Sequence, residues 1–199
     1  MPLVHSTDIA SVLGLAKTGV FGRALGRFVL WLLSLDEINA IYDRSVASGD
    51  ETQFLEALLY HFKIRYHISP TDLKRIPKQG PVVLVCNHPL GGIDGIILMH
   101  FLQHIRPDVK LMANFLLERA VPLKKWIIPV NPFDEKQSGK SSIGGFRKLL
   151  RHLENNGLFA VFPAGEVAST LKKQVPIDPV WNEATMRLIQ RAKVPIVPI

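Results

Sequence analysis

A histidine and an aspartate stand close together in the segment Asn87–Gly95, whose sequence is NHPLGGIDG. A carboxylate that holds one imidazole nitrogen orients the ring and stabilises the imidazolium that forms when the ring accepts a proton. A free imidazole, with a pKa near ~6.5, is largely neutral and able to accept a proton near pH 7. The pair therefore predicts general-base chemistry, with His88 as the base and Asp94 as its orienter. The alternative is a histidine that only satisfies its hydrogen bonds at the end of a strand.

The same segment is rich in glycine, at positions 91, 92 and 95. Glycine lets a loop turn back, and it allows backbone N–H groups to approach a substrate closely enough to stabilise a developing oxyanion. We therefore expect Gly91 and Gly92, together with Asn87, to line the substrate-binding site.

A second motif, with the sequence FPAGE, follows the apolar run Leu158–Val161 in the same way that the first motif follows Pro81–Cys86. We expect a turn here at the end of a strand, where a parallel sheet presents side chains to a site; its residues are Phe162, Pro163, Gly165 and Glu166. The glutamate is suited to bind an ammonium group on a substrate. The alternative is a structural turn with a solvated glutamate.

Strands and helices alternate from residue 81 onward. Apolar runs predict strands at 81–86, 109–113, 126–130, 158–162 and 194–199, and helical spacing predicts helices after the histidine–aspartate loop, at 142–155 and at 181–193. This alternation is typical of an α/β fold with a mostly parallel central sheet flanked by helices. Both motifs then follow strand ends, where such a sheet delivers side chains to a site.

Ahead of this pattern, residues 1–62 are predicted to form an N-terminal helical region, and residues 63–199 the main domain. Apolar residues recur at helical spacing within 36–62, and Asp50 or Thr52 is suited to cap a second helix there. The alternating segment 64–68 predicts a strand, and Ser69 followed by proline predicts a short helix start.

A membrane-facing helix is predicted near the N-terminus, at residues 20–35. Arg23 and Arg27 interrupt its apolar sequence, so it falls short of the ~20 apolar residues that a spanning helix needs. The two arginines share one helical face, and Phe28 and Trp31 belong to another, which favours a helix lying in the membrane interface. The alternative is an ordinary amphipathic helix packed on the core. We expect no cleavable signal.

The composition limits the class of partner. The chain has 199 residues, a net charge of +7 and a pI near 9.7, and 47% of its residues are hydrophobic, with a mean hydropathy of +0.17. A basic surface favours acidic lipid headgroups, an acidic carrier protein or nucleic acid. We expect no nucleic-acid partner, because the sequence has no arginine-rich run, zinc pattern or RNA-binding signature.

The single cysteine and the scattered histidines limit the chemistry further. One cysteine, Cys86, excludes an internal disulfide framework and fits a reducing compartment, and its position in a strand predicts a buried structural thiol. The histidines show no ligand spacing, so no metal site is expected.

Four blocks, NHPLGGIDG, ANFLL, IPVNPF and FPAGEV, occur in this order between about Leu35 and Ile199, and a VPIVPI strand ends the chain. This pattern resembles the lysophospholipid acyltransferase superfamily and, within it, a hemolysin-like branch linked to ornithine and glycine lipid synthesis. The resemblance implies a membrane-associated O-acyltransferase without a cofactor. Such an enzyme would transfer a fatty acyl group from acyl carrier protein or coenzyme A to the hydroxyl of a lyso-lipid. It also implies a peripheral position on an anionic membrane surface, at the cytoplasmic face of the bacterial inner membrane, and a chain that continues beyond Ile199.

The chain departs from the commonest family pattern at several positions. Five residues, not four, separate His88 from Asp94, and Ala164 replaces the usual glutamate of the second motif. The block Val130–Asp134 lacks the arginine that pairs with an acceptor phosphate in glycerophosphate members, although Asn131 can supply a neutral hydrogen bond. We therefore expect a lyso-amino-acid lipid as acceptor, with lysophosphatidic acid second. The alternatives are N-acylation of ornithine or glycine, and a non-catalytic lipid-binding protein.

Overall fold

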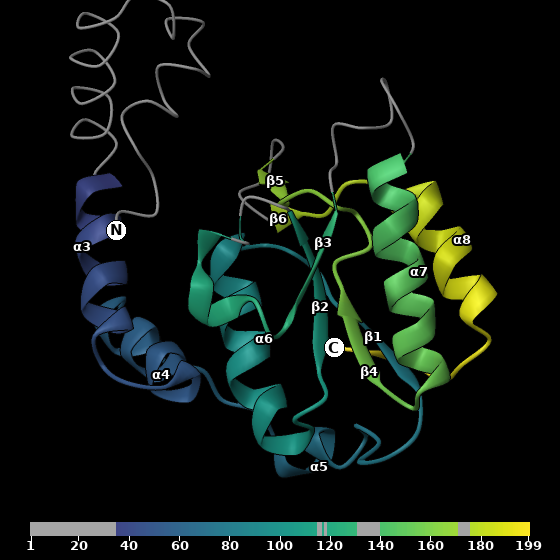
Figure 1. The fold of residues 1–199 in the computed structure, drawn as a ribbon, viewed down its shortest axis with the longest axis horizontal. Coiled ribbons are helices and arrows are strands. Elements are labelled where there is room, and N and C mark those ends of the chain that lie inside the picture. Colours follow the sequence, from purple (N-terminus) through teal and green to yellow (C-terminus); the bar gives the residue numbers. More distant parts are fainter. Residues whose placement is uncertain (1–34, 115–116, 118, 131–139, 171–175) are drawn as a thin grey trace, which may run out of the picture. The chain divides into compact units, whose positions relative to one another are not determined.

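The computed structural model describes residues 35–114, 117, 119–130, 140–170 and 176–199. The chain divides into two compact units, Met1–Ile64 and Arg65–Ile199 (Figure 1). Residues 20–34 of the predicted membrane-facing helix and the predicted site residue Asn131 lie outside the described residues.

The described part of the first unit contains two helices, α3 (Leu35–Val46) and α4 (Glu51–His61). Asp50 caps α4, as predicted: its carboxylate accepts the backbone N–H groups of Thr52 and Gln53, while the Gln53 side chain accepts the N–H of Asp50. This reciprocal capping box satisfies N–H groups that have no partner within a helix. Among the described residues, no helix is both long enough and apolar enough to cross a membrane.

The strand predicted at 64–68 is wrong, because residues 64–69 form no strand in the structure. In the second unit, the Tyr66 hydroxyl is hydrogen-bonded to Nδ1 of His100, and the Tyr66 ring lies 6.4 Å from that of Phe101. The alternating pattern therefore reflects a side chain anchored on a helix and not a backbone paired in a sheet.

The second unit contains a parallel five-stranded sheet, in the order β3-β2-β4-β1-β7. This confirms the predicted fold class. The strands are β1 (Val82–Val85), β2 (Lys110–Asn114), β3 (Ile127–Val130), β4 (Leu158–Val161) and β7 (Ile196–Pro198). The helical segments are α5 (Pro70–Leu73), α6 (Gly92–Ile105), the 3-10 turn η3 (Val121–Leu123), α7 (Lys140–Glu154) and α8 (Glu183–Ala192). A small antiparallel hairpin, β5 (Ser169–Thr170) with β6 (Pro176–Ile177), was not predicted.

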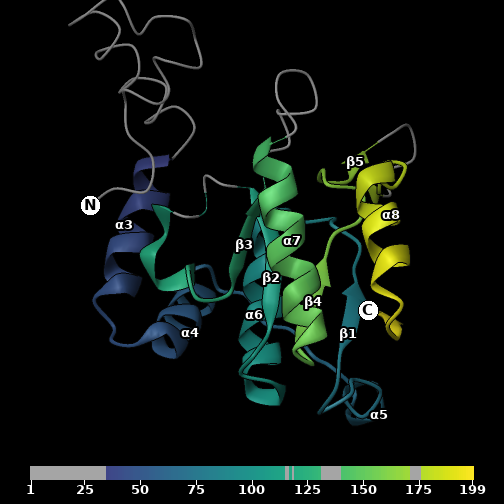
Figure 2. The same ribbon diagram turned by 45° about the vertical axis from the view of Figure 1, so that its right-hand side comes forward.

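Helices cover both faces of this sheet (Figures 1 and 2). On one face, alternate strand residues pack against α7 and α8 in a cluster that includes Val83, Phe159, Leu149 and Leu188, all at most 5% exposed. On the other face lies α6, where a Cβ placed on Gly95 would stand 3.6 Å from the Leu111 side chain. The central strands are therefore buried on both faces, as the continuous apolar runs predict.

A buried arginine joins the loops at the amino edge of the sheet. Arg106 is 4% exposed; its Nε and Nη2 donate to the Asp108 carboxylate at 2.9 and 2.6 Å, and it also donates to the carbonyls of Gly80 and Asn156. Asp108 in turn accepts the backbone N–H of Leu158, the first residue of β4. The hydrogen bond from Arg106 holds the pKa of Asp108 below its usual range. This network fixes the start of β4 relative to the loop before β1.

We predict that Arg106→Ala lowers the free energy of unfolding by about 3 kcal/mol, because buried carbonyls lose their donor and a carboxylate loses its partner. The matched control is Arg75→Ala. Arg75 pairs with Asp72 but its side chain is 71% exposed, so its loss should cost less than about 1 kcal/mol. Urea unfolding followed by circular dichroism measures both changes, and equal losses in the two variants would contradict the structural role of the network.

Candidate active site

The two motifs meet at the carboxyl edge of the sheet. Strands β1 and β4 are direct neighbours, and their register pairs Val85 with Val161. The pairing continues for one residue, since the Cys86 N–H donates to the Val161 carbonyl at 3.0 Å. The first motif leaves β1 and the second leaves β4 at this point, so the predicted site residues of both motifs lie in adjacent loops.

The structure brings His88 and Asp94 together. His88 Nδ1 lies 3.1 Å from Asp94 Oδ2, and the side chains are 17% and 13% exposed. The same oxygen accepts the backbone N–H of Leu90 at 2.8 Å, which fixes the carboxylate in the loop. An ionised carboxylate only accepts hydrogen bonds, so a hydrogen bond between these two atoms requires the proton on Nδ1, and in a neutral ring this leaves the lone pair on Nε2. The geometry is that of a base and its orienter, although five residues separate the two in sequence.

A glycine with a positive φ angle allows this loop to close. Gly91 has φ 66° and ψ −131°, a conformation that side-chain-bearing residues rarely adopt, and it stands at the N-cap of α6. Its carbonyl accepts the N–H of Asp94 at 3.0 Å, so the turn begins the helix whose first turn presents the carboxylate. A Cβ on Gly91 would stand 3.4 Å from Val167, which follows the second motif. Gly92 and Asn87 are both exposed beside this turn.

The second motif holds the histidine ring from one side. The Phe162 ring is stacked on that of His88, with centroids 4.0 Å apart and planes 17° from parallel. Phe162 and Pro163 are buried, and Gly165 makes the turn with φ 74° and an N–H donated to the Phe162 carbonyl at 3.0 Å. Glu166 is exposed just beyond this turn. Its role as a substrate ligand stays a prediction.

The backbone of His88 is also held by hydrogen bonds, at both its carbonyl and its N–H. Its carbonyl accepts the N–H of Ala168 at 2.9 Å, and its own N–H donates to both carboxylate oxygens of Asp178, at 3.1 and 3.2 Å. Sequence reasoning missed Asp178, because it lies 90 residues from His88 and no motif or periodicity marks it.

The one thiol of the chain, that of Cys86, is buried at the carboxyl edge of the sheet. Cys86 is 7% exposed, and burial, followed by the negative charge of Asp94, raises the pKa of its thiol to about 12. A thiol with so high a pKa is not a nucleophile at neutral pH. The structure therefore agrees with the predicted structural role of this cysteine.

Comparison with known proteins identifies the family. The sequence model described as Acyltransferase matches residues 67–199, a range that includes both motifs and the whole sheet. The chain belongs to the Acyltransferase family. This confirms the family relationship that the order of the motifs predicts, while the hemolysin-like branch stays a prediction.

Two curated relatives carry the same name. The chain is 28% identical over 165 residues to a "Lyso-glycine lipid O-acyltransferase" of Bacteroides thetaiotaomicron, with 82% of this chain and 57% of the relative covered. It is 28% identical over 163 residues to a protein of the same name from Phocaeicola vulgatus, with 79% and 55% covered. The chain thus spans little more than half the length of the curated relatives it matches.

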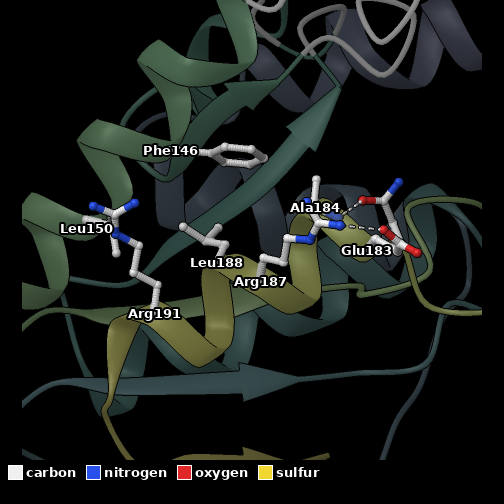
Figure 3. A pocket seen from close by; sticks show the side chains of 8 residues that line it. Phe146, Leu150, Glu183, Ala184, Arg187, Leu188 and Arg191 are labelled. Atoms are coloured by element: carbon white, nitrogen blue, oxygen red, sulfur yellow. Dashed lines mark hydrogen bonds and ion pairs between the residues drawn. The ribbon is translucent and has the colours of Figure 1, made fainter.

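A pocket of about 560 Å³ lies between α7 and α8 of this acyltransferase-family chain (Figure 3). Phe146 and Leu150 of α7 line it, together with Leu188 and Arg191 of α8. The pocket reaches Asn182, whose side chain caps α8 and whose N–H donates to the Pro163 carbonyl at 2.9 Å. One end of the pocket therefore adjoins the second motif.

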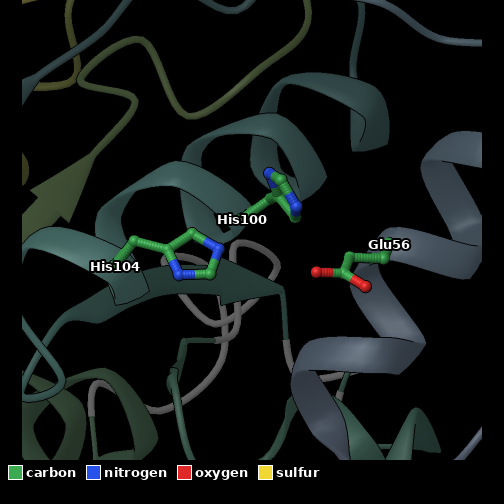
Figure 4. A group of neighbouring side chains, drawn as sticks. All are labelled: Glu56, His100 and His104. Carbon is green, nitrogen blue, oxygen red and sulfur yellow. The ribbon is translucent and has the colours of Figure 1, made fainter.

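Two histidines stand one turn apart on α6, the helix that begins in the first motif (Figure 4). The rings of His100 and His104 make an edge-to-face contact with centroids 5.4 Å apart, and His100 is hydrogen-bonded to Tyr66. Burial raises the pKa of the Tyr66 hydroxyl.

We predict that the thiol of Cys86 reacts with iodoacetamide at pH 8 about 10³-fold more slowly in the native protein than in urea, because a pKa of about 12 leaves very little thiolate. Cys86 is the only cysteine, so total alkylation reports this residue alone. Mass spectrometry over time measures both rates. Native alkylation at the rate of the unfolded chain would show that the thiol is not buried.

Proposed function

We propose that this protein is an acyltransferase that moves a fatty acyl group from a thioester donor to the hydroxyl of a lyso-lipid. The observation that carries the proposal is the contact between His88 Nδ1 and Asp94 at 3.1 Å, at the carboxyl edge of the sheet. The Acyltransferase family match and the names of the two relatives support the reaction class.

His88 acts as the general base. The acceptor hydroxyl gives its proton to His88 Nε2 as its oxygen attacks the thioester carbonyl, and Asp94 stabilises the imidazolium that forms. The tetrahedral intermediate then collapses: the carbon–sulfur bond breaks, and the leaving thiolate takes the proton from Nε2. The products are an ester and a free thiol, and no covalent intermediate on the protein is required. Backbone N–H groups of the glycine-rich loop are the candidate donors to the oxyanion.

The acceptor that we propose is a lyso-amino-acid lipid, with lysophosphatidic acid second. The relatives are named for a lyso-glycine lipid, and the block at 130–134 lacks the arginine expected for a phosphate. Phe162, Pro163 and Gly165 shape the acceptor site in this proposal, and Glu166, Asn87, Gly91, Gly92 and Asn131 line it.

The donor and the location follow from charge in this proposal. A net charge of +7 favours an anionic partner, either acyl carrier protein or the phosphates of coenzyme A. The same charge favours an anionic membrane, at the cytoplasmic face of the inner membrane, with residues 1–62 as the membrane-interfacial region and 63–199 as the catalytic domain.

We predict that wild-type protein transfers radiolabelled acyl groups to a lyso-lipid and that His88→Ala lowers kcat about 10²- to 10⁴-fold, because the reaction loses its general base. Asp94→Asn should lower kcat as well, since an amide can present a donor to Nδ1 and favour the wrong tautomer. The assay offers acyl-CoA and acyl carrier protein as donors, and lyso-glycine lipid, lysophosphatidic acid and free ornithine or glycine as acceptors.

The matched control is His67→Ala, which removes an exposed histidine of the same unit and should leave turnover unchanged. Mild alkali separates the products, because it cleaves an ester and leaves an amide. An amide product from a free amino acid would replace O-acylation by N-acylation. Equal turnover by wild type and His88→Ala would remove His88 as the base, and lipid binding without turnover in either protein would favour the non-catalytic alternative.

A further inference from the structure

The proposed mechanism does not use the contact between Asp178 and the backbone of His88. Both carboxylate oxygens accept the His88 N–H, at 3.1 and 3.2 Å, and Asp178 is half-buried. A backbone N–H bonded to a carboxylate is a charge-assisted hydrogen bond, roughly twice as strong as one between neutral groups. The loop that carries the histidine is thus tied to a segment 90 residues later in the chain.

This segment bridges both motifs. Asp178 holds His88 in the first motif, and four residues later the Asn182 N–H donates to the Pro163 carbonyl in the second motif at 2.9 Å. Between these anchors the chain leaves β6 and enters α8, so the segment is fixed at both ends by regular structure. A segment that is hydrogen-bonded to both motifs is able to set the distance between them.

The position of the His88 ring depends on its backbone as well as on its ring contacts. Asp94 fixes the ring through Nδ1 and Phe162 stacks on its face, but both contacts require the Cα of His88 to stay in place. The Ala168 N–H holds the His88 carbonyl, and Asp178 holds the His88 N–H. Without Asp178, one of the two backbone anchors is lost.

We infer that Asp178 is a positioning residue for His88, which holds the base at its distance from the acceptor hydroxyl in the proposed acyl transfer. The inference rests on the proposed function for its effect on rate. Asp178 acts through the backbone of His88 and takes no part in proton transfer. A misplacement of a reacting group by about 1 Å can cost about 10²-fold in rate.

Steady-state kinetics of three variants tests the inference. Asp178→Ala removes both acceptors and should lower kcat about 10- to 100-fold, with KM for donor and acceptor within about 3-fold of wild type. Asp178→Asn keeps one carbonyl oxygen and the side-chain shape, so it should lower kcat only about 3-fold. Glu154→Gln, which neutralises an exposed carboxylate at the end of α7, should match wild type. Circular dichroism compares the melting temperatures of all proteins.

The rate of ethoxyformylation of His88 by diethyl pyrocarbonate provides a second measurement that does not depend on activity. Peptide mass spectrometry should show His88 modified at least about 3-fold faster in Asp178→Ala than in wild type, because a loosened loop exposes the ring more often. The exposed His67 should react at the same rate in both proteins and serves as the internal standard.

Two results would overturn the inference. One is Asp178→Ala with a raised KM and an unchanged kcat, which would make Asp178 a substrate contact. The other is an unchanged modification rate of His88 in Asp178→Ala, which would show that Asp178 connects two segments without affecting the position of the histidine. If wild-type protein transferred no acyl group, the proposed function would fail, and the modification rates would still decide whether Asp178 positions His88.

Discussion

Parallel pairing of β1 with β4 is the constraint on which the candidate site depends. The register Val85 to Val161 ends both strands at the same edge, so the loop with His88 and the turn with Phe162 begin side by side. Stacking of the two rings at 4.0 Å follows from this register. A slip by one residue would turn alternate side chains to the opposite face of the sheet, and the packing of Phe159 against α7 and α8 opposes such a slip. The buried core therefore fixes the geometry of the site.

The two edges of the sheet are stabilised in different ways. At the amino edge, Arg106 satisfies several carbonyls at once and ties the start of β4 to neighbouring loops. At the carboxyl edge, the carboxylates of Asp94 and Asp178 both contact His88. The positive φ angle of Gly91 lets the loop turn so that Asp94 lies within hydrogen-bond distance of the ring. Unusual backbone conformations persist where the surrounding structure fixes them. In parallel α/β sheets ligands bind at the carboxyl ends of the strands, and this is the edge that carries the candidate site.

The sequence reveals the features that depend on local chemistry. Apolar runs locate the strands, and Asp50 and Ser69 locate helix starts, because a strand buried on both faces and a capped helix each leave a local pattern. The pairing of His88 with Asp94 is also foreseeable, since one short loop joins them. Strand order, the β5–β6 hairpin and the bond from Asp178 depend on contacts between distant segments, which a single sequence does not record. The strand prediction for the segment near Tyr66 is wrong, because the alternating apolar and polar residues there reflect alternating burial of side chains and not strand pairing.

The central claim is that Asp94 fixes the His88 ring with the proton on Nδ1 and the lone pair on Nε2, ready to accept a proton. Nitrogen-15 NMR of protein labelled at histidine measures this tautomer directly, and comparison with Asp94→Asn tests its cause. The account predicts a protonated Nδ1 and an unprotonated Nε2 for His88 in the wild-type protein near neutral pH, with the preference reduced in Asp94→Asn. A neutral ring with its proton on Nε2 would contradict the account, because the nitrogen that faces away from Asp94 would then have no lone pair for the acceptor proton.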